Sequence, residues 1–128
     1  MKFDPLDPPR RFLVGHPGQE IALHHCADLH LAPDEQVTLK TETGTEFDIV
    51  RKEWGYYATP SLNGRLVSFG LRSALVSSGG RRYLLLVEKD KQADFEAYLI
   101  KQKMTLVAWL DGPEIEFATT EDAAQAPT

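Results

Sequence analysis

The feature that most constrains the fold is a pair of apolar runs joined by a glycine-containing turn. Residues 73–77 and 82–87 flank the segment Ser78-Gly79-Gly80. Glycine adopts the positive φ angles that a tight hairpin requires, and short apolar runs bounded by turn residues are typical of strands. We therefore expect an antiparallel hairpin here and interpret the rest of the chain around it.

Other parts of the chain show the same pattern of short strands separated by turns. Residues 20–31 alternate apolar and polar side chains, with His25 interrupting the apolar face, which predicts a strand that bends near its middle. Residues 36–41 and 46–50 flank a Thr- and Gly-containing turn and predict a second hairpin. Residues 54–58 form a short aromatic run, and a loop containing Pro60 then leads into residues 65–69.

One helix is expected, close to the C-terminal end. Asp90 can cap a helix over residues 91–102, in which Phe95 and Leu99 share a stripe of 3.6-residue periodicity. This stripe should cover one face of the sheet. Residues 104–110 then predict a last strand that returns to the sheet.

These elements predict an α+β fold. We expect a mostly antiparallel β-sheet or a small β-barrel of about seven strands, with one C-terminal helix followed by a last strand. At 128 residues the chain fits one domain. We assign residues 1–112 to a single β-rich domain, whose residues 1–19 form an extended arm because their prolines and glycines disfavour a regular ladder or helix. Residues 113–128 are an acidic tail that we expect to be disordered.

Composition favours a cytoplasmic protein with no membrane contact. No run approaches the roughly 18 apolar residues that a spanning helix needs. The first residues contain acids and prolines where a secretory signal needs an apolar stretch. The single cysteine, Cys26, forms no intramolecular disulfide, which fits a reducing compartment.

The net charge of −5 comes from the C-terminal end. Residues 111–128 hold five acidic residues and no Lys or Arg, so the rest of the chain has equal numbers of acids and bases. Between Arg51 and Arg82 there are six bases and only one acid, Glu53. The overall acidity argues against nucleic acid as a partner, because the tail would repel a polyanion.

The segment 51–65 is richest in groups that bind ligands. It combines aromatic rings, basic groups, an amide and hydroxyls around a constrained loop. Aromatic faces suit sugar rings or planar ligands, and arginines suit carboxylate or phosphate. We predict a small binding or accessory module without a cofactor that recognises an anionic or sugar-like molecule, or an acidic segment of a partner. The predicted ligand-binding residues are Arg51, Trp54, Tyr57, Asn63, Arg65 and Arg72.

Two alternatives belong to other functional classes. His24, Cys26 and His30 are candidate metal ligands, which would suit a small metal- or His-dependent isomerase or hydrolase. Such an enzyme could have a cupin-like barrel, although the closely spaced pair of metal-binding histidines typical of cupins is not visible. The other alternative is a structural homodimer without a ligand, in which an exposed strand pairs with its copy.

Overall fold

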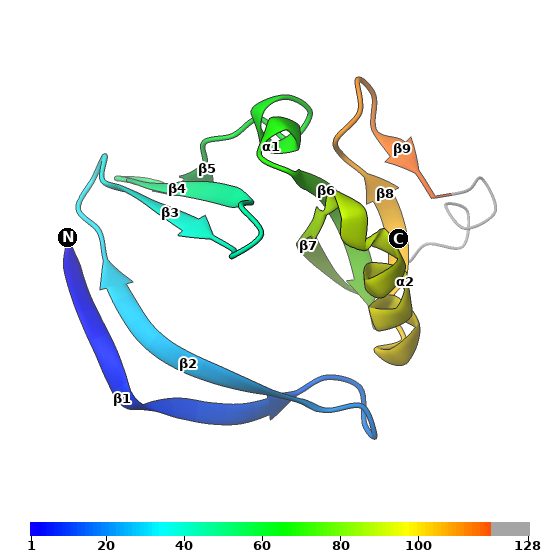
Figure 1. The fold of residues 1–128 in the computed structure, drawn as a ribbon, viewed down its shortest axis with the longest axis horizontal. Helices are drawn as coiled ribbons and strands as arrows, with labels where there is room; N and C mark the ends of the chain where they lie inside the picture. Colours follow the sequence, from blue (N-terminus) through cyan, green and yellow to red (C-terminus); the bar gives the residue numbers. More distant parts are fainter. Residues whose placement is uncertain (119–128) are drawn as a thin grey trace. The chain divides into compact units, whose positions relative to one another are not determined.

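The computed structural model describes residues 1–118, which form three open antiparallel sheets (Figure 1). The mostly antiparallel architecture with one C-terminal helix and a following strand is confirmed, but these residues form no closed barrel. They contain nine strands, not about seven. The elements in chain order are β1 (Lys2–Val14), β2 (Ile21–His30), β3 (Gln36–Lys40), β4 (Glu46–Lys52), β5 (Gly55–Ala58), α1 (Arg65–Ser68), β6 (Leu71–Ser78), β7 (Arg81–Glu88), a 3-10 turn η1 (Lys89–Lys91), α2 (Gln92–Lys101), β8 (Thr105–Trp109) and β9 (Glu116–Phe117).

The chain divides into two compact units. Unit 1 comprises residues 1–38 and 48–59, and unit 2 comprises residues 39–47 and everything from residue 60 onward. The division passes through β3 and β4, the two strands of one hairpin.

Unit 1 begins with a long two-stranded ribbon made by β1 and β2 (Figure 1). Its register pairs Phe3 with Leu29 and Phe12 with Leu23, and paired residues of an antiparallel ladder share a face. The alternation predicted for residues 20–31 therefore does place apolar residues on one face of the ribbon. These four side chains are nevertheless 37–60% exposed.

The ladder of β1 was not predicted, because its prolines suggested an irregular arm. Pro8 and Pro9 fall in the register shift between Pro5 and Arg10, where β1 has extra residues opposite β2. Proline lacks an N–H, so it is tolerated at bulges and on edge strands, where no ladder bond is lost. Both strands of a two-stranded ribbon are edge strands, so β1 can contain prolines and still pair with β2. The predicted arm is therefore extended, and it is also part of a ladder.

Unit 1 also contains the hairpin of β4 and β5, which pair in antiparallel register from Ile49–Ala58 to Lys52–Gly55. The turn after β2 is fastened to β4 by two backbone hydrogen bonds. The N–H of Asp34 donates to the carbonyl of Arg51 at 2.7 Å, and the N–H of Arg51 donates to the carbonyl of Glu35 at 3.0 Å. These bonds place Asp34 beside the end of β4.

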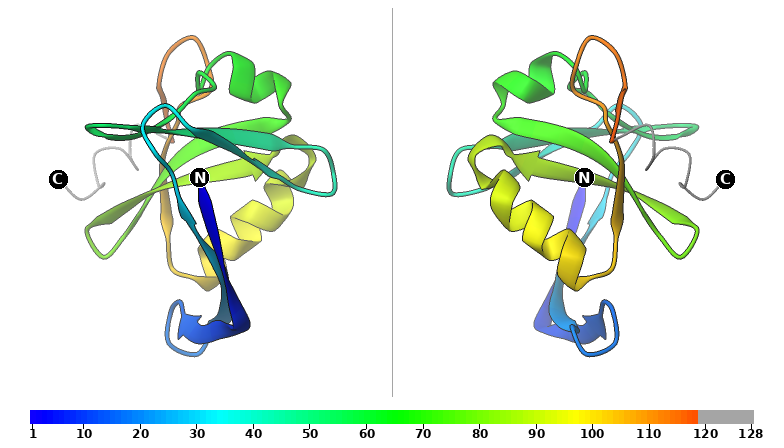
Figure 2. Two further views of the ribbon diagram at one scale, coloured as in Figure 1. Left: turned by 90° about the vertical axis from the view of Figure 1, so that its left-hand side faces the viewer. Right: turned by 90° about the vertical axis from the view of Figure 1, so that its right-hand side faces the viewer.

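Unit 2 is built on a sheet with the strand order β7-β6-β8-β9. The predicted glycine hairpin is present, with β6 and β7 paired from Leu71–Glu88 to Ser78–Arg81. Helix α2 packs on one face of this sheet (Figure 2). Phe95 and Leu99 are buried, as the helical periodicity predicted. They pack with residues of β6, β7 and β8 in the cluster Ala74, Val76, Val87 and Trp109.

Residues 65–69 form helix α1 and the residue after it. The side chain of Ser61 explains where this turn begins, because its hydroxyl accepts a hydrogen bond from the N–H of Arg65 at 3.1 Å. Leu66 is fully buried, so its side chain packs α1 against the rest of unit 2.

The segment assigned to the acidic tail begins in regular structure. Glu116 and Phe117 form β9 and pair with Trp109 and Ala108 of β8. Residues 119–128 lie outside the described residues. No helix in the described part of the chain is long and apolar enough to cross a membrane.

Candidate functional site

The six predicted ligand-binding residues are divided between the two units. Arg51, Trp54 and Tyr57 lie on the β4–β5 hairpin of unit 1. The other three, Asn63, Arg65 and Arg72, lie in unit 2. The candidate site is therefore built from the residues that each unit brings together by itself.

In unit 2, Arg72 is held by neighbours within its own unit. Its Nε donates to Asp111 Oδ2 at 2.7 Å, its Nη2 to Asp111 Oδ1 at 3.3 Å, and its Nη1 to Gln92 Oε1 at 2.9 Å. The guanidinium also lies over the ring of Trp109, 3.8 Å from its centroid. This arginine joins β6, α2 and the segment after β8, and its hydrogen-bonding groups point to these partners.

Arg65 and Asn63 are both exposed, on and before helix α1. The guanidinium of Arg65 lies over the ring of Phe69, 5.5 Å from its centroid. Neither residue lines either of the two hollows described below.

The β4–β5 hairpin presents two aromatic rings at its turn. Trp54 is 73% exposed and Tyr57 is 45% exposed. Their ring centroids are 6.4 Å apart and their planes differ by 26°. Two rings this close to parallel form an open apolar surface, which we call the aromatic platform (Trp54 and Tyr57).

The strand register shows which neighbours share the face of the platform. Tyr57 is opposite Val50, and Lys52 lies two residues after Val50, so alternation puts Lys52 on the same face. Lys52 Nζ forms an ion pair with Asp34 Oδ1. The hydrogen bond from Lys52 to Asp34, and the negative charge of that carboxylate, raise the pKa of Lys52 above its ordinary value. A paired cation and anion therefore border the platform.

Arg51 lies on the opposite face of the hairpin. It is opposite Tyr56 in the register, and its guanidinium lies 5.9 Å from the centroid of the Tyr56 ring. Its Nη1 donates to the backbone carbonyl of Lys52. Within unit 1, the predicted arginine and the predicted aromatic pair thus face different ways.

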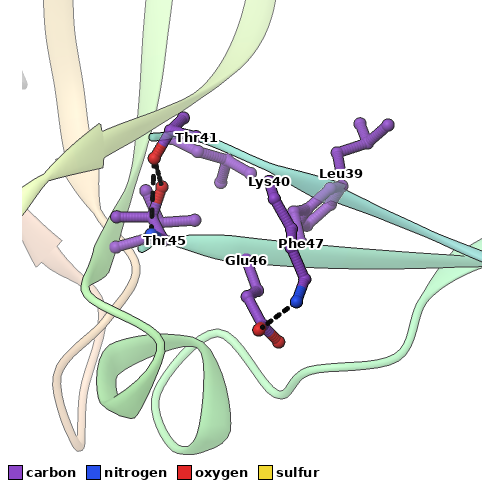
Figure 3. A pocket seen from close by; sticks show the side chains of 8 residues that line it. Leu39, Lys40, Thr41, Thr45, Glu46 and Phe47 are labelled. Carbon is purple, nitrogen blue, oxygen red and sulfur yellow. Dashed lines mark hydrogen bonds and ion pairs between the residues drawn. The ribbon is translucent and has the colours of Figure 1, made fainter. Parts of the chain in front are cut away.

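Unit 2 contains a second candidate, an apolar groove beside the turn between β3 and β4 (Figure 3). Its charged groups are paired with each other, since Lys40 Nζ lies 3.1 Å from Glu46 Oε1. Figure 3 also shows the hydroxyl contact between Thr41 and Thr45. A further hollow of about 450 Å³ shares part of this lining and extends along β7 and α2. Its apolar walls include Leu85, Phe95 and Tyr98.

The three metal candidates all lie on β2. Cys26 Sγ contacts the backbone carbonyl of His24 at 3.3 Å, and His30 Nε2 lies 2.8 Å from Asp4 Oδ2. Across residues 1–118, the side chains of His, Cys, Asp and Glu nowhere gather in a group of three that could hold a metal ion.

Sequence reasoning missed the polar border of the platform. Lys52 stands directly beside Arg51 in the sequence, and the alternation of a strand could have shown that these two residues face opposite ways. No pattern in the sequence indicated that Asp34 lies beside Lys52. Its place beside Lys52 depends on hydrogen bonds between segments distant in the chain.

No protein-family model, curated protein or solved structure matches this chain. The class of protein is therefore defined by its own structure, a β-rich chain of three antiparallel sheets with one C-terminal helix of ten residues. Within it, the aromatic platform with its Lys52–Asp34 border is the candidate site that joins an open apolar surface to polar groups.

Proposed function

We propose that the protein is a non-catalytic binding module that holds a sugar ring against the aromatic platform. The observation that carries this proposal is the exposure of Trp54, 73%, in a side chain that is stacked on Tyr57. A large exposed aromatic surface is unfavourable in water and is typical of a recognition site. One face of a pyranose ring presents C–H groups, which pack well on the electron-rich face of an aromatic ring.

The polar border favours a neutral sugar over an anionic ligand. Hydroxyl groups both donate and accept hydrogen bonds, so they can bridge the ammonium of Lys52 and the carboxylate of Asp34. A carboxylate or phosphate would be attracted by Lys52 and repelled by Asp34. Of the ligands considered from the sequence, the geometry therefore supports the sugar-like one.

The platform sets the scale of the expected affinity. Covering about 100–150 Å² of aromatic surface contributes roughly 2.5–4 kcal/mol at about 25 cal/mol per Å². A few hydrogen bonds to the border offset part of the cost of association. We therefore expect dissociation constants on the order of 1–10 mM for a single sugar ring. The binding is proposed for the cytoplasmic, reducing setting that the sequence favours.

Titration with a panel of neutral mono- and disaccharides, followed by calorimetry and by tryptophan fluorescence, tests this function. Trp109 is only 7% exposed, so a ligand-induced change in emission reports mainly on Trp54. We expect Trp54→Ala and Tyr57→Ala to weaken binding about tenfold or more, because each removes one of the two stacking faces, worth on the order of 1–3 kcal/mol.

Tyr56→Ala is the matched control. Tyr56 is 66% exposed and adjacent to Tyr57, but it shares the face of Arg51. Its loss should leave the affinity unchanged. Equal effects of the Tyr56 and Tyr57 substitutions, or no binding by any sugar at tens of millimolar, would exclude the platform as a sugar site.

A further inference from the structure

The outer strand of the unit 2 sheet is β7, and the first four of its eight residues are exposed. In the strand order β7-β6-β8-β9, β7 has β6 on one side, and no other strand formed by residues 1–118 pairs with its outer side. Its eight residues, RRYLLLVE, contain no proline or glycine. Tyr83 and Leu84 are 42% and 49% exposed. A strand of this kind presents unpaired backbone groups and invites pairing with another strand.

The sequence of β7 is complementary to itself in antiparallel register. When a two-fold axis perpendicular to the sheet relates the two copies, facing residues of the paired strands lie on the same side of the sheet. Because side chains alternate along a strand, the axis must then pass beside a residue and not between two residues. Only registers centred on a residue are therefore allowed. Centring on Leu85 places Arg82 opposite Glu88 of the second copy, at both ends of the pairing, and Leu84 opposite Leu86. Centring on Leu84 instead places Arg82 opposite Leu86, and centring on Leu86 places Glu88 opposite Leu84. Among the residues of β7 itself, only the register on Leu85 pairs opposite charges.

The two faces of β7 are consistent with this register. Val87 belongs to the core under α2 and Leu85 packs against it. Alternation then puts Arg82, Leu84 and Glu88 on the other face of the sheet. Glu88 already accepts a hydrogen bond from the hydroxyl of Thr43, and a carboxylate has two oxygens, so a second partner can be accommodated.

We propose that the protein forms a two-fold symmetric dimer in which β7 pairs with β7 of a second copy, centred on Leu85. The sheet then continues from one copy to the next, and each Arg82 pairs with Glu88 of the other copy. The hollow of about 450 Å³ beside β7 has apolar walls from β7 and α2, and the second copy would cover part of it. This inference is independent of sugar binding.

The size of the edge sets the expected strength of the dimer. Seven paired residues span about 24 Å, and the sheet with its covering helix is about 20 Å thick, so each copy buries roughly 500 Å². Stable complexes bury about 800 Å² per partner. We therefore expect a dissociation constant in the micromolar range and a monomer–dimer equilibrium that shifts with concentration.

Sedimentation velocity of the full chain, from about 1 to 500 µM and with reductant to prevent disulfides through Cys26, tests the dimer. Two charge reversals give the decisive comparison. Arg82→Glu and Glu88→Arg should each weaken self-association tenfold or more, because each creates two like-charge contacts. An equimolar mixture of the two variants should regain wild-type association, because every contact in the mixed dimer is then between opposite charges.

Arg81→Glu is the matched control. Arg81 is adjacent to Arg82 and this substitution changes the net charge equally, but the proposed register places Arg81 opposite Lys89, so Arg81→Glu should not weaken the dimer. Circular dichroism checks that Glu88→Arg, which also loses the bond from Thr43, remains folded. The exposed side chain of Arg82 forms no hydrogen bond or ion pair with another of residues 1–118, so the comparison of Arg82→Glu with Arg81→Glu decides the proposal by itself.

Three results would overturn this dimer. The first is a wild-type monomer throughout the concentration range. The second is a dimer that Arg82→Glu does not weaken, since the chain would then associate through another surface, such as the β1–β2 ribbon. The third is an equal loss with Arg81→Glu, which would show a general effect of charge.

Discussion

Arg72 shows how one side chain can join three elements of unit 2. The carboxylate of Asp111 accepts two hydrogen bonds from its guanidinium, and the side chains of the two residues are 26% and 11% exposed. Gln92 and the ring of Trp109 take the remaining contacts. Such a partly buried, bidentate pair matters most when one partner is removed, because the other charge is left desolvated.

We therefore predict that Arg72→Ala lowers the free energy of unfolding by about 2–4 kcal/mol. Arg72→Lys should recover less than half of this loss, because lysine keeps the charge but lacks the planar fork and stacks poorly on Trp109. Urea denaturation measures both. The exposed Arg81→Ala serves as control and should change stability by less than about 0.5 kcal/mol. A loss for Arg72→Ala as small as for Arg81→Ala would contradict this structural role.

The sequence did not separate Arg72 from the binding candidates, and the reason is physical. Its partner Asp111 is 39 residues away in the sequence. A guanidinium in a basic segment suits a bound anion as well as a distant carboxylate of the same chain, and only the tertiary structure decides between them. Trp54 and Tyr57 are close in the sequence around a tight turn, so their proximity to each other could be predicted, but their exposure could not.

At the scale of elements, local signals predicted the β6–β7 hairpin and helix α2 well. Both depend on neighbours in the sequence, the two glycines in one case and the 3.6-residue stripe in the other. The ladder of β1 was missed because its prolines argued against a strand. Two of these prolines are accommodated by a register shift between β1 and β2, and no local sequence pattern reveals such a shift. The helical turn α1 was missed because its start depends on a hydrogen bond that the hydroxyl of Ser61 accepts from the N–H of Arg65.

Helix α2 offers a matched test of its packing. Leu99 is 7% exposed and its neighbour Ile100 is 74% exposed. We predict that Leu99→Ala costs about 2–5 kcal/mol, because it removes buried apolar volume and leaves a cavity under the helix. Ile100→Ala should cost less than about 0.5 kcal/mol. Denaturant unfolding of both variants checks this, and similar losses for the two would mean that the helix presents a different face to the sheet.

At the scale of the whole molecule, burial is distributed unevenly between the two units. All residues of the main apolar cluster belong to unit 2. In unit 1, the β1–β2 ribbon exposes large apolar side chains on its paired strands. A two-stranded ribbon that gains no covering layer from its own unit is only marginally stable in water. The two units should therefore differ in local stability.

We predict that backbone amides of the β1–β2 ladder exchange with solvent much faster than those of the β6–β8 ladder. Opening the ribbon exposes little additional apolar surface, whereas opening β6 must disrupt the cluster around Val76 and Trp109. In hydrogen-exchange mass spectrometry, peptides covering Leu75 and Ala108 should be protected by several kcal/mol more than those covering Leu13 and Leu23. The protein should be dilute, well below the micromolar range proposed for the dimer, so that association does not protect β7 or the ribbon. Equal protection of both ladders at this dilution would show that the ribbon is stabilised by contacts beyond its own pairing, and the uneven distribution of stability would then be wrong.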